Sequence, residues 1–278
     1  MQFLTILIAC HNRKALTQRV LQQVVDFGTK HFELEFVIVD DGSTDGTSEM
    51  LQQFKRVNVK YFSITIVRGT GDWYWSKSMQ VAQLSATQQS GALLWLNDDV
   101  DLYEDSFAKL RFYSDMYPND VLVGQCYDPL RKKASFGGFR NSSTNPLKLI
   151  RQTAIESIMP VDTFCGNFVY IPSQVRSLIG TVDGEFEHGH GDLDYGYRVT
   201  KAGKKAYCFP GYVGECSKDD EPKLSNRRQA LAYWNSKKKS PIRSQIKFLK
   251  RHGGLFWPIW LVTPYLRLLV HGRKTRLN

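Results

Sequence analysis

The sequence predicts an α/β fold with a mostly parallel sheet flanked by helices, and three observations support this. Short apolar segments alternate with segments of helical periodicity over the first hundred residues. Segments such as ALLWL, from Ala92 to Leu96, are apolar throughout, as strands buried on both faces are. The length of 278 residues and the hydrophobic content of 42% are sufficient for one large domain with a substantial core.

The expected elements follow one another in a regular order. The first is a β-prone segment from Phe3 to Cys10, followed by a helix on which Leu16, Val20 and Val24 recur at helical spacing. We expect Asn12 to cap this helix. Further strands are predicted at 36–39, 59–67, 92–96, 121–127, 164–171 and 205–209, and further helices at 47–54, 76–88 and 192–202.

Polar clusters follow three of the predicted strands, at residues 9–13, 40–45 and 97–101. Because right-handed crossovers bring the carboxyl ends of parallel strands to one edge of the sheet, these clusters are expected to converge. That edge is where open α/β sheets bind ligands. The sequence contains neither a GxGxxG fingerprint nor a P-loop, which argues against a dinucleotide or Walker-type site.

The turn after the fourth predicted strand carries Asp98, Asp99 and Asp101 within four positions. Clustered carboxylates are tolerated where a hard divalent cation such as Mg²⁺ or Mn²⁺ neutralises them, often shared with substrate phosphates. The alternative is a solvated turn in which Asp101 or Asp105 caps the next helix. The apolar strand before the turn favours the metal site.

The segment DDGSTDGT, from Asp40 to Thr47, ends the second predicted strand. Gly42 permits a tight turn, and Ser43, Thr44 or Asp45 can cap the helix that follows. These local roles leave the second aspartate, Asp41, unexplained. A carboxylate at a strand end can accept the ring N–H of uracil or thymine.

Four segments together resemble family-two glycosyltransferases with the GT-A fold, over roughly residues 3–215. They are ILIACHNR, FVIVDDGSTDGT, LWLNDDVDL and GHGDLDYGYRVTKAG. GTGDWYWSKSM and the tail resemble the bacterial branch that builds surface polysaccharides, including rhamnosyl- and galactofuranosyltransferases. The resemblance implies an inverting hexosyltransferase that uses Mn²⁺ or Mg²⁺. Its donor would be a UDP- or dTDP-linked sugar, and its acceptor a glycan or a lipid-linked molecule.

The resemblance also implies roles for individual residues. Asp41 would read the base, Asp99 would bind the metal, and Asp192 would act as the general base. The implied nucleotide-binding residues are Ala9, His11, Arg13, Asp41, Asn97 and Asp98. The implied donor or acceptor pocket consists of Asp72, Trp73, Trp75, Lys77, Gly166, Asn167 and His190.

The chain departs from the family pattern at four places. Asn97 replaces the usual first aspartate of the DXD site, and His11 stands where many relatives carry tyrosine. Lys77 takes a position where glycine is common. Many relatives have a metal-binding histidine after the last core strand, whereas this chain has Glu215 and Cys216 there. Metal affinity would then be weaker, or Glu215 would substitute.

Local alternatives remain for several of these residues. Asp192 is placed at a helix N-terminus, which stabilises an ionised carboxylate, and an ordinary acidic N-cap is the alternative role. Asp194 is two positions further on, so the two side chains cannot face the same way. The aromatic residues of GDWYW are either a donor-pocket wall or packing of a long loop. His190 is either a hydroxyl-binding residue or an ordinary loop residue.

Charge divides the chain into two parts. The net charge is +10, yet residues 1–222 hold 23 basic and 27 acidic residues, whereas residues 223–278 hold fourteen basic residues and no acidic one. We therefore expect a catalytic domain at 1–222 and a basic, aromatic, helical extension at 223–278. Pro258 and Pro264 interrupt the longest apolar stretch of this extension, so it is expected to lie in the interface of an anionic membrane.

The expected location is the cytoplasm, peripheral on the inner face of the cell membrane, because the N-terminal segment has no basic n-region and no small-residue cleavage site. The five cysteines are odd in number and form no CxxC pair, so we expect them to be reduced, without a disulfide framework. Packing of the tail on the domain is one alternative, and RNA binding is disfavoured because no RNP or KH signature is present. A catalytically inactive scaffold that binds sugar nucleotides or membrane is the second functional hypothesis. A nucleotidyltransferase is the third. The oligomeric state is not predicted.

Overall fold

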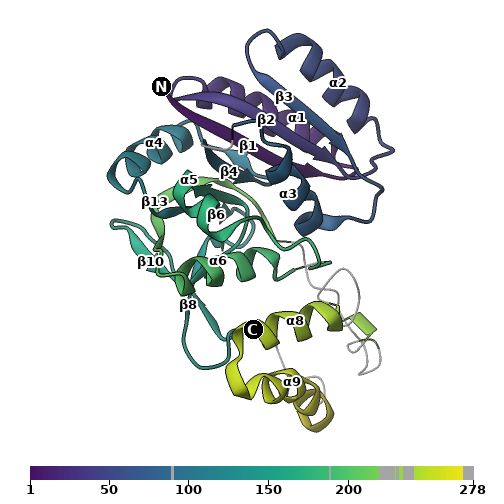
Figure 1. Ribbon diagram of the computed structural model, residues 1–278, viewed down its shortest axis with the longest axis vertical. Coiled ribbons are helices and arrows are strands. Elements are labelled where there is room, and N and C mark those ends of the chain that lie inside the picture. The colour runs from purple at the N-terminus through teal and green to yellow at the C-terminus, as the bar shows by residue number, and fades with distance from the viewer. Residues whose placement is uncertain (89–90, 188, 219–228, 230–231, 234–240, 272–278) are drawn as a thin grey trace.

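The computed structural model of this chain describes all residues except 89–90, 188, 219–228, 230–231, 234–240 and 272–278. A twisted sheet runs through the molecule and helices cover both of its faces (Figure 1). The C-terminal helices lie together at one end, beside the helix formed by residues 191–201. The α/β class predicted from the sequence is confirmed.

The first half of the sheet consists of parallel strands connected by helices, as predicted. Its strands are β1 (Gln2–Cys10), β2 (Phe32–Asp40), β3 (Ser63–Arg68) and β4 (Ala92–Leu96). The connecting helices are α1 (Lys14–Gln23), extended by the π-helical turn η1 (Val24–Gly28), α2 (Thr47–Asn58) and α3 (Tyr74–Ser85). β1 lies between β2 and β4, and β3 pairs with the outer edge of β2.

Two local predictions in this half are wrong. The third strand begins at Ser63 rather than 59, because the chain leaves α2 through turns at residues 59–62. Asn12 does not cap α1; it adopts a left-handed conformation (φ 52°) and bonds to the next strand end instead. Its backbone N–H donates to Ser43 Oγ, and its Oδ1 accepts the Thr44 N–H. Asn12 therefore joins two of the predicted polar clusters.

The second half of the sheet is mixed. Its elements are β5 (Asp101–Leu102), α4 (Ser106–Met116), β6 (Val121–Asp128), β7 (Lys133–Phe136), β10 (Met159–Val161), β12 (Phe168–Ile171), α5 (Ser173–Ile179), α6 (Gly191–Lys201) and β13 (Ala206–Glu215). The strand order is β10-β13-β6-β12-β4-β1-β2-β3, with β12 antiparallel to both of its neighbours. The observed sheet is therefore mostly parallel, as predicted, and the exceptions are β12 and the short edge strands β5, β7 and β10.

The predicted strand at 164–171 is two strands separated by a turn at residues 165–167. The first of them, β11 (Thr163–Phe164), belongs to a small separate sheet with β8 (Gly138–Asn141) and β9 (Leu149–Arg151). The second, β12, pairs with β4 in the main sheet. The turn between them lies at the end of β4, because Asn97 N–H bonds to the Asn167 carbonyl.

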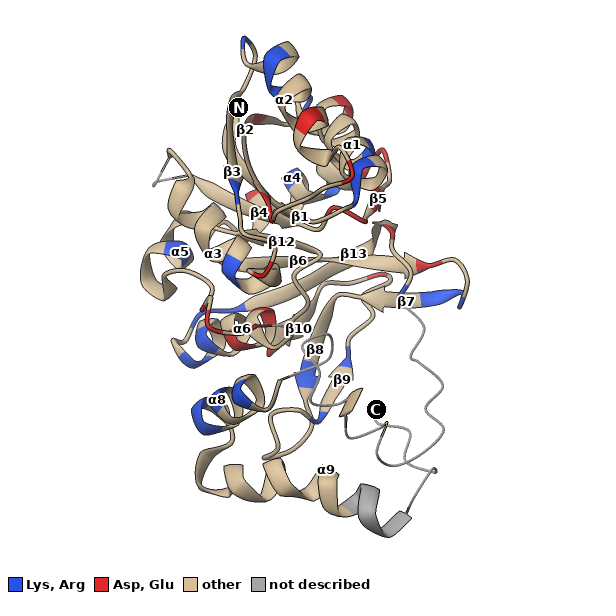
Figure 2. Cartoon of the chain, turned by 90° about the vertical axis from the view of Figure 1, so that its right-hand side faces the viewer, with Lys and Arg blue, Asp and Glu red and all other residues tan. Residues whose placement is uncertain are grey.

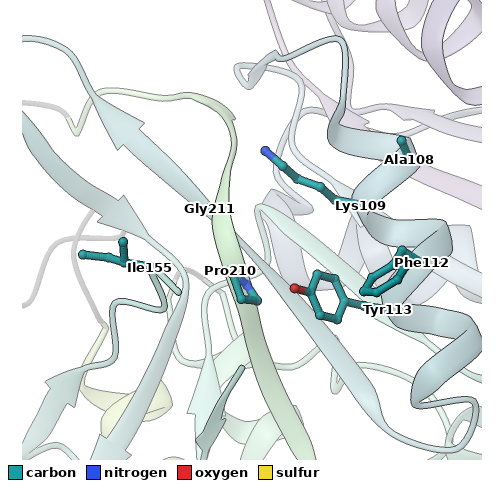
Figure 3. Close-up of a pocket in the computed structure, with 7 residues that line it drawn as sticks. All are labelled: Ala108, Lys109, Phe112, Tyr113, Ile155, Pro210 and Gly211. Carbon is teal, nitrogen blue, oxygen red and sulfur yellow. The ribbon is translucent and has the colours of Figure 1, made fainter. Parts of the chain in front are cut away.

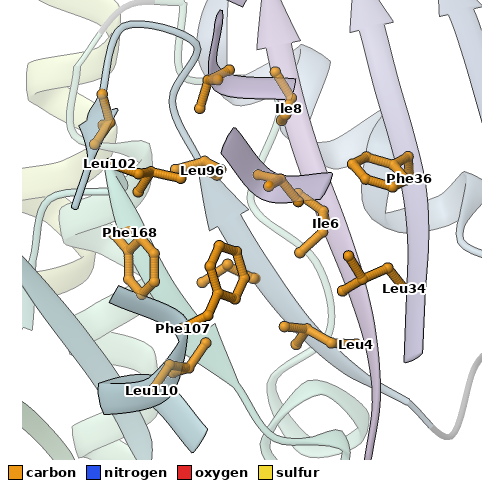
Figure 4. Packing of buried hydrophobic residues seen from close by; sticks show 14 of the residues in the cluster. Leu4, Ile6, Ile8, Leu34, Phe36, Leu96, Leu102, Phe107, Leu110 and Phe168 are labelled. Atoms are coloured by element: carbon orange, nitrogen blue, oxygen red, sulfur yellow. The ribbon is translucent and has the colours of Figure 1, made fainter. Parts of the chain in front are cut away.

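Apolar side chains fill both faces of the sheet. Figure 4 shows the first cluster, in which Phe107 of α4 and Phe168 of β12 lie edge to face, 6.1 Å between ring centroids. On the other face, the fully buried Trp95 contacts the rings of Trp75 and Tyr195 at 5.5 and 4.8 Å. This second cluster holds α3 and α6 against the end of β4.

Among its described residues, the C-terminal extension includes α8 (Ile242–His252), the 3₁₀ turn η2 (Gly254–Phe256) and α9 (Trp257–His271). The face of α8 that carries Phe248 and Leu249 is buried with Phe186 and Tyr197. In the cartoon of Figure 2, much of α8 is coloured as Lys or Arg. Among the described helices, none is both long and apolar enough to cross a membrane.

Candidate active site

Arg13 is the cation that lies between the carboxylates of the acidic turn. Its Nη1 is 2.9 Å from Asp98 Oδ1 and 2.9 Å from Asp99 Oδ2. Arg13 follows the end of β1 and the two aspartates follow the end of β4, so the adjacency of these parallel strands brings them together. Since Asn12 also bonds to Ser43 and Thr44, all three predicted polar clusters converge.

The two aspartates of this pair differ in environment. The Asp98 side chain is only 5% exposed, and burial raises its pKa to about 6 although Arg13 opposes the shift. The Asp99 side chain is 29% exposed. Asp101 lies apart from both, with Gln23 and Arg19 at its oxygens, as expected for a residue outside the site. Asp99 is therefore the carboxylate that remains accessible to a ligand.

Asp41 is bound by the backbone of the loop that leads into α3. Its Oδ1 accepts the Gly71 N–H at 2.8 Å, and its Oδ2 accepts the N–H groups of Trp73 and Tyr74 at 2.9 and 3.0 Å. A carboxylate has about four acceptor positions, so three bonds leave little capacity for a base. Asp41 thus orders the aromatic loop, and its predicted contact with a base would use the position that remains. The His11 ring contacts the Asp41 carbonyl oxygen through Nδ1.

The aromatic loop reaches the acidic turn through Trp75. Its Nε1 donates to Asn97 Oδ1 at 2.8 Å, so the asparagine that replaces the usual aspartate holds the indole in place. The backbone N–H of Asn97 donates to the Asn167 carbonyl at 3.0 Å. Trp75, Asn97 and Asn167 are therefore neighbours.

Asp192 lies in the first turn of α6. Its Oδ2 accepts the Gly166 N–H at 3.1 Å, and its Oδ1 accepts the Leu193 N–H at 2.8 Å. Burial raises the pKa of Asp192 above its ordinary value of 3.8, although the backbone N–H groups oppose the shift. A carboxylate of raised pKa, partly buried beside a loop, has the properties of a general base.

Gly166 connects Asp192 with Trp75. A Cβ at Gly166 would lie 2.3 Å from the Trp75 ring, so a larger residue would displace the indole or the turn. Since Trp75 binds Asn97 and Gly166 binds Asp192, one continuous set of contacts joins the candidate base to the acidic turn. These contacts therefore bring the residues together as one candidate site.

Cys216 is a site residue whose contact the sequence did not predict. Its thiol lies 3.5 Å from Asp99 Oδ1, and Asn167 Nδ2 lies 3.8 Å from the same sulfur. Burial raises the pKa of Cys216, with the charge of Asp99 acting in the same direction, so the sulfur is a protonated thiol. Glu215, one of the two alternatives for the missing histidine, accepts the Tyr103 hydroxyl at 3.1 Å. The sequence did carry a signal for this contact, because Glu215 and Cys216 stand where many relatives have a metal-binding histidine.

Four predicted residues have contacts that do not bear on the acidic turn. Lys77 Nζ donates to Gln80 Oε1 at 3.0 Å within α3, and exposed Asp72 accepts the Thr70 hydroxyl. Ala9 is partly buried on β1. The His190 ring packs on Phe248 at 4.9 Å, and burial lowers its pKa to about 4, so it is neutral near pH 7. His188 lies outside the described residues.

An apolar hollow of about 460 Å³ lies elsewhere on the molecule, between α4 and β13 (Figure 3). The residues that line it are Ala108, Lys109, Phe112, Tyr113, Ile155, Pro210 and Gly211. None of them belongs to the candidate site, and Lys109 Nζ bonds to the Tyr212 carbonyl and to Asp105. We assign no ligand to this hollow.

Residues 5–171 match the model of the family described as Glycosyl transferase family 2, which is more than half of the chain. The chain belongs to this family. It is therefore a glycosyltransferase, and the family resemblance is confirmed, with three of the four sequence segments inside the match. The match ends at the last residue of β12, so α6 with Asp192 lies beyond it. No curated protein sequence matches the chain significantly.

Solved structures share the fold at low sequence identity. The mannosyltransferase PcManGT from Pyrobaculum calidifontis, in complex with GDP-Man and Mn²⁺, is 16% identical, with 95% of this chain and 70% of that chain covered and a TM-score of 0.54. A 1–349 fragment of S. aureus TarS with UDP-GlcNAc is 12% identical, covering 96% and 81%, with a TM-score of 0.59. GalNAc-T7 with UDP, GalNAc and Mn²⁺ is 14% identical, covering 95% and 54%, with a TM-score of 0.61. The glycosyltransferase is thus a GT-A-like protein.

Proposed function

We propose that this glycosyltransferase moves a hexose from a nucleoside diphosphate sugar to a hydroxyl of a glycan or lipid-linked acceptor, with inversion, in the synthesis of a cell-surface polysaccharide. One observation carries the proposal: the contacts from Asp192 through Gly166, Trp75 and Asn97 to the acidic turn. These contacts support the proposal because they connect Asp192, the candidate base, with the acidic turn, where the diphosphate would lie. Inverting transfer requires these two groups on opposite sides of the reacting carbon.

The proposed donor carries uracil or thymine. Asp41 retains one acceptor position, which suits the single ring N–H of these bases. Related folds have been solved with UDP-GlcNAc and with UDP, although the mannosyltransferase of the same fold was solved with GDP-Man. The base is therefore a proposal that rests on Asp41.

A divalent metal fits the acidic turn. Across the described residues, no three histidine, cysteine, aspartate or glutamate side chains form a group able to hold a metal by themselves. Mg²⁺ and Mn²⁺ commonly use one or two carboxylates together with substrate phosphates, and the accessible Asp99 supplies one. When bound, Mn²⁺ or Mg²⁺ would supply positive charge for the departing diphosphate.

The proposed chemistry at the protein side chains is a single displacement. Asp192 accepts the proton of the acceptor hydroxyl as its oxygen attacks the anomeric carbon, and the bond from that carbon to the diphosphate oxygen breaks. Trp75 and Asn97 form the wall beside the donor, and the Gly166 N–H holds one Asp192 oxygen in place. The guanidinium of Arg13 lies close enough to the turn to bind a phosphate oxygen as well.

Asp99→Ala is expected to abolish metal-dependent donor binding. The measurement is the melting temperature of the full chain with UDP- or dTDP-sugars, with and without Mn²⁺. A donor at a hundred times its Kd stabilises the native state by about 2.7 kcal/mol, so the wild type should melt several degrees higher with donor and metal. Asp101→Ala, which removes a carboxylate outside the site, should retain this shift. An unchanged shift in Asp99→Ala would contradict the assignment.

The C-terminal helices are proposed to dock on an anionic membrane surface. Large apolar side chains are exposed along one face of η2 and α9, with exposed fractions of 47–94%: Leu255, Phe256, Ile259, Val262 and Leu266. Basic residues dominate the neighbouring α8, and residues 223–278 contain no acidic residue. An exposed apolar helix face beside cations suits a helix that lies in the interface plane.

Binding to vesicles tests this surface. The full chain should co-sediment with vesicles containing phosphatidylglycerol more strongly than with phosphatidylcholine alone, and salt should weaken the binding. Leu255→Glu combined with Ile259→Glu should reduce binding at least ~10-fold, because two side chains of about 1.5–3 kcal/mol each are lost. Val57→Glu, at an exposed apolar position on α2, is the control. Equal sedimentation of both variants would exclude this surface.

A further inference from the structure

We propose that Arg251 and His252 of α8 are positioning residues that hold the first turn of α6, and with it Asp192, in the catalytic orientation. This inference rests on the proposed role of Asp192 as the general base. Residues 251 and 252 lie far outside the matched family domain, in the segment expected to form a separate basic extension. In this proposal the segment supports the active site, in addition to its proposed contact with the membrane.

The central contact is a fully buried carboxylate, Asp194. Its Oδ2 binds Arg198 Nε at 2.9 Å within α6, and its Oδ1 binds Arg251 Nη1 at 2.7 Å and His252 Nε2 at 2.9 Å from α8. Burial raises the pKa of Asp194, but the hydrogen bond from His252 and the charges of Arg198 and Arg251 outweigh burial and lower it. Asp194 is therefore ionised and depends on α8 for two of its three partners.

The same helix also holds the loop before α6. Arg251 Nη2 donates to Asp183 Oδ2 at 2.9 Å, and Lys247 Nζ lies 2.8 Å from the other Asp183 oxygen. Arg198 of α6 also holds this segment, because its Nη1 and Nη2 donate at 2.8 Å to the carbonyls of Ile179, the last residue of α5, and of Thr181. One network of charges thus joins α8, the loop at 179–185 and α6.

The network surrounds the turn that carries Asp192. On one side of Asp192, the His190 ring packs on Phe248 of α8, and on the other Asp194 binds Arg251 and His252. The backbone bond from Asp194 N–H to the His190 carbonyl, at 2.7 Å, closes the turn between them. Asp192 itself contacts Gly166 and its own turn. The direction of the Asp192 side chain is therefore set by a turn that α8 contacts at both ends, at His190 and at Asp194.

The test compares three variants of the full chain. Arg251→Met removes the hydrogen bonds and keeps most of the side-chain volume, Arg251→Lys keeps the charge, and Arg243→Met removes an exposed arginine from the same helix. A misplacement of about 1 Å can lower turnover ~100-fold. Arg251→Met should therefore lower kcat by ~10–100-fold with the KM for donor within about twofold. Arg251→Lys should recover most of kcat, and Arg243→Met should match the wild type.

A second readout separates this proposal from the proposed function. Amide hydrogen exchange of residues 191–195 should be faster in Arg251→Met than in Arg243→Met, while exchange in β1 and β4 stays the same. If the wild type shows no transfer, the proposed function fails, and the exchange rates still decide whether α8 orders this turn. Unchanged exchange and kcat in Arg251→Met would overturn the proposal. So would an equal loss of kcat and donor affinity that Arg251→Lys does not recover.

Discussion

Asp192→Asn is expected to abolish sugar transfer while leaving the fold and donor binding intact. Removal of a general base lowers turnover by about 10²–10⁴-fold, and asparagine is nearly isosteric with aspartate. Its carbonyl oxygen can still accept the N–H of Gly166 or of Leu193. The measurement is kcat for release of nucleoside diphosphate in the presence of acceptor, together with the Kd of the donor. The loss should appear in kcat, because Asp192 would act on the acceptor.

The raised pKa of Asp192 adds a dependence on pH. Transfer needs the ionised carboxylate, so kcat/KM should rise with pH through a pKa above the ordinary 3.8 of an aspartate. At pH values between the pKa of Asp192 in the unfolded chain and its higher pKa in the folded chain, the folded chain binds more protons than the unfolded chain. The contribution of Asp192 to the free energy of unfolding therefore falls as the pH rises. At neutral pH, Asp192→Asn should therefore melt at or above the temperature of the wild type. A lower melting temperature would show that the carboxylate has a structural role instead.

A matched control and the inactive-scaffold hypothesis complete this experiment. Asp105 also lies at the start of a helix, next to α4, where it pairs with Lys109 at the surface. Asp105→Asn should keep full activity, since no candidate site residue contacts it. If the wild type binds donor but shows no turnover, and Asp192→Asn behaves identically, the chain is a scaffold. Turnover that survives in Asp192→Asn would assign the base to another residue.

The convergence of the polar clusters was predictable because it follows from connectivity. Apolar strands joined by helices must place their carboxyl ends at one edge, which brought Arg13 next to Asp98 and Asp99. The partners of each side chain were not predictable in the same way. Asp41 is occupied by N–H groups of residues 71–74, and that depends on how a long loop folds over Gly42, which no periodicity encodes.

The packing of α8 on α6 shows the same limit at greater separation. The sequence predicted helices in the basic tail, and it indicated that Asp192 and Asp194 face different ways because they are two positions apart. It did not pair Asp194 with Arg251, 57 residues later. The tail contains fourteen basic residues, and the sequence does not indicate which of them would pair with Asp194. The burial of Phe248 and Leu249 decides which face of α8 meets α6.

Asp41→Ala is expected to destabilise the fold and to weaken donor binding together. The variant leaves the N–H groups of Gly71, Trp73 and Tyr74 without their acceptor. Hydrogen bonds to a charged group contribute about 1.5–3 kcal/mol each and are not additive, so we expect a loss of about 3 kcal/mol or more in the free energy of unfolding. Trp75 follows these residues directly, so its bond to Asn97 should be disturbed as well.

Asp41→Asn separates the two roles of this carboxylate. Asparagine retains one oxygen for the loop. If Asp41 mainly orders the loop, the Asp41→Asn variant should lose part of its free energy of unfolding and a matching part of its donor affinity. If Asp41 only reads the base, the variant should lose donor affinity while its free energy of unfolding stays unchanged. Asp26→Ala, which removes an exposed carboxylate of η1 that bonds to Gln22 and to no candidate site residue, should change neither. Urea unfolding and donor titration on the wild type and the three variants decide between these outcomes. Loss of the three N–H bonds to Asp41 lowers stability, and it lowers donor affinity at the same time only if the loop itself forms the pocket wall.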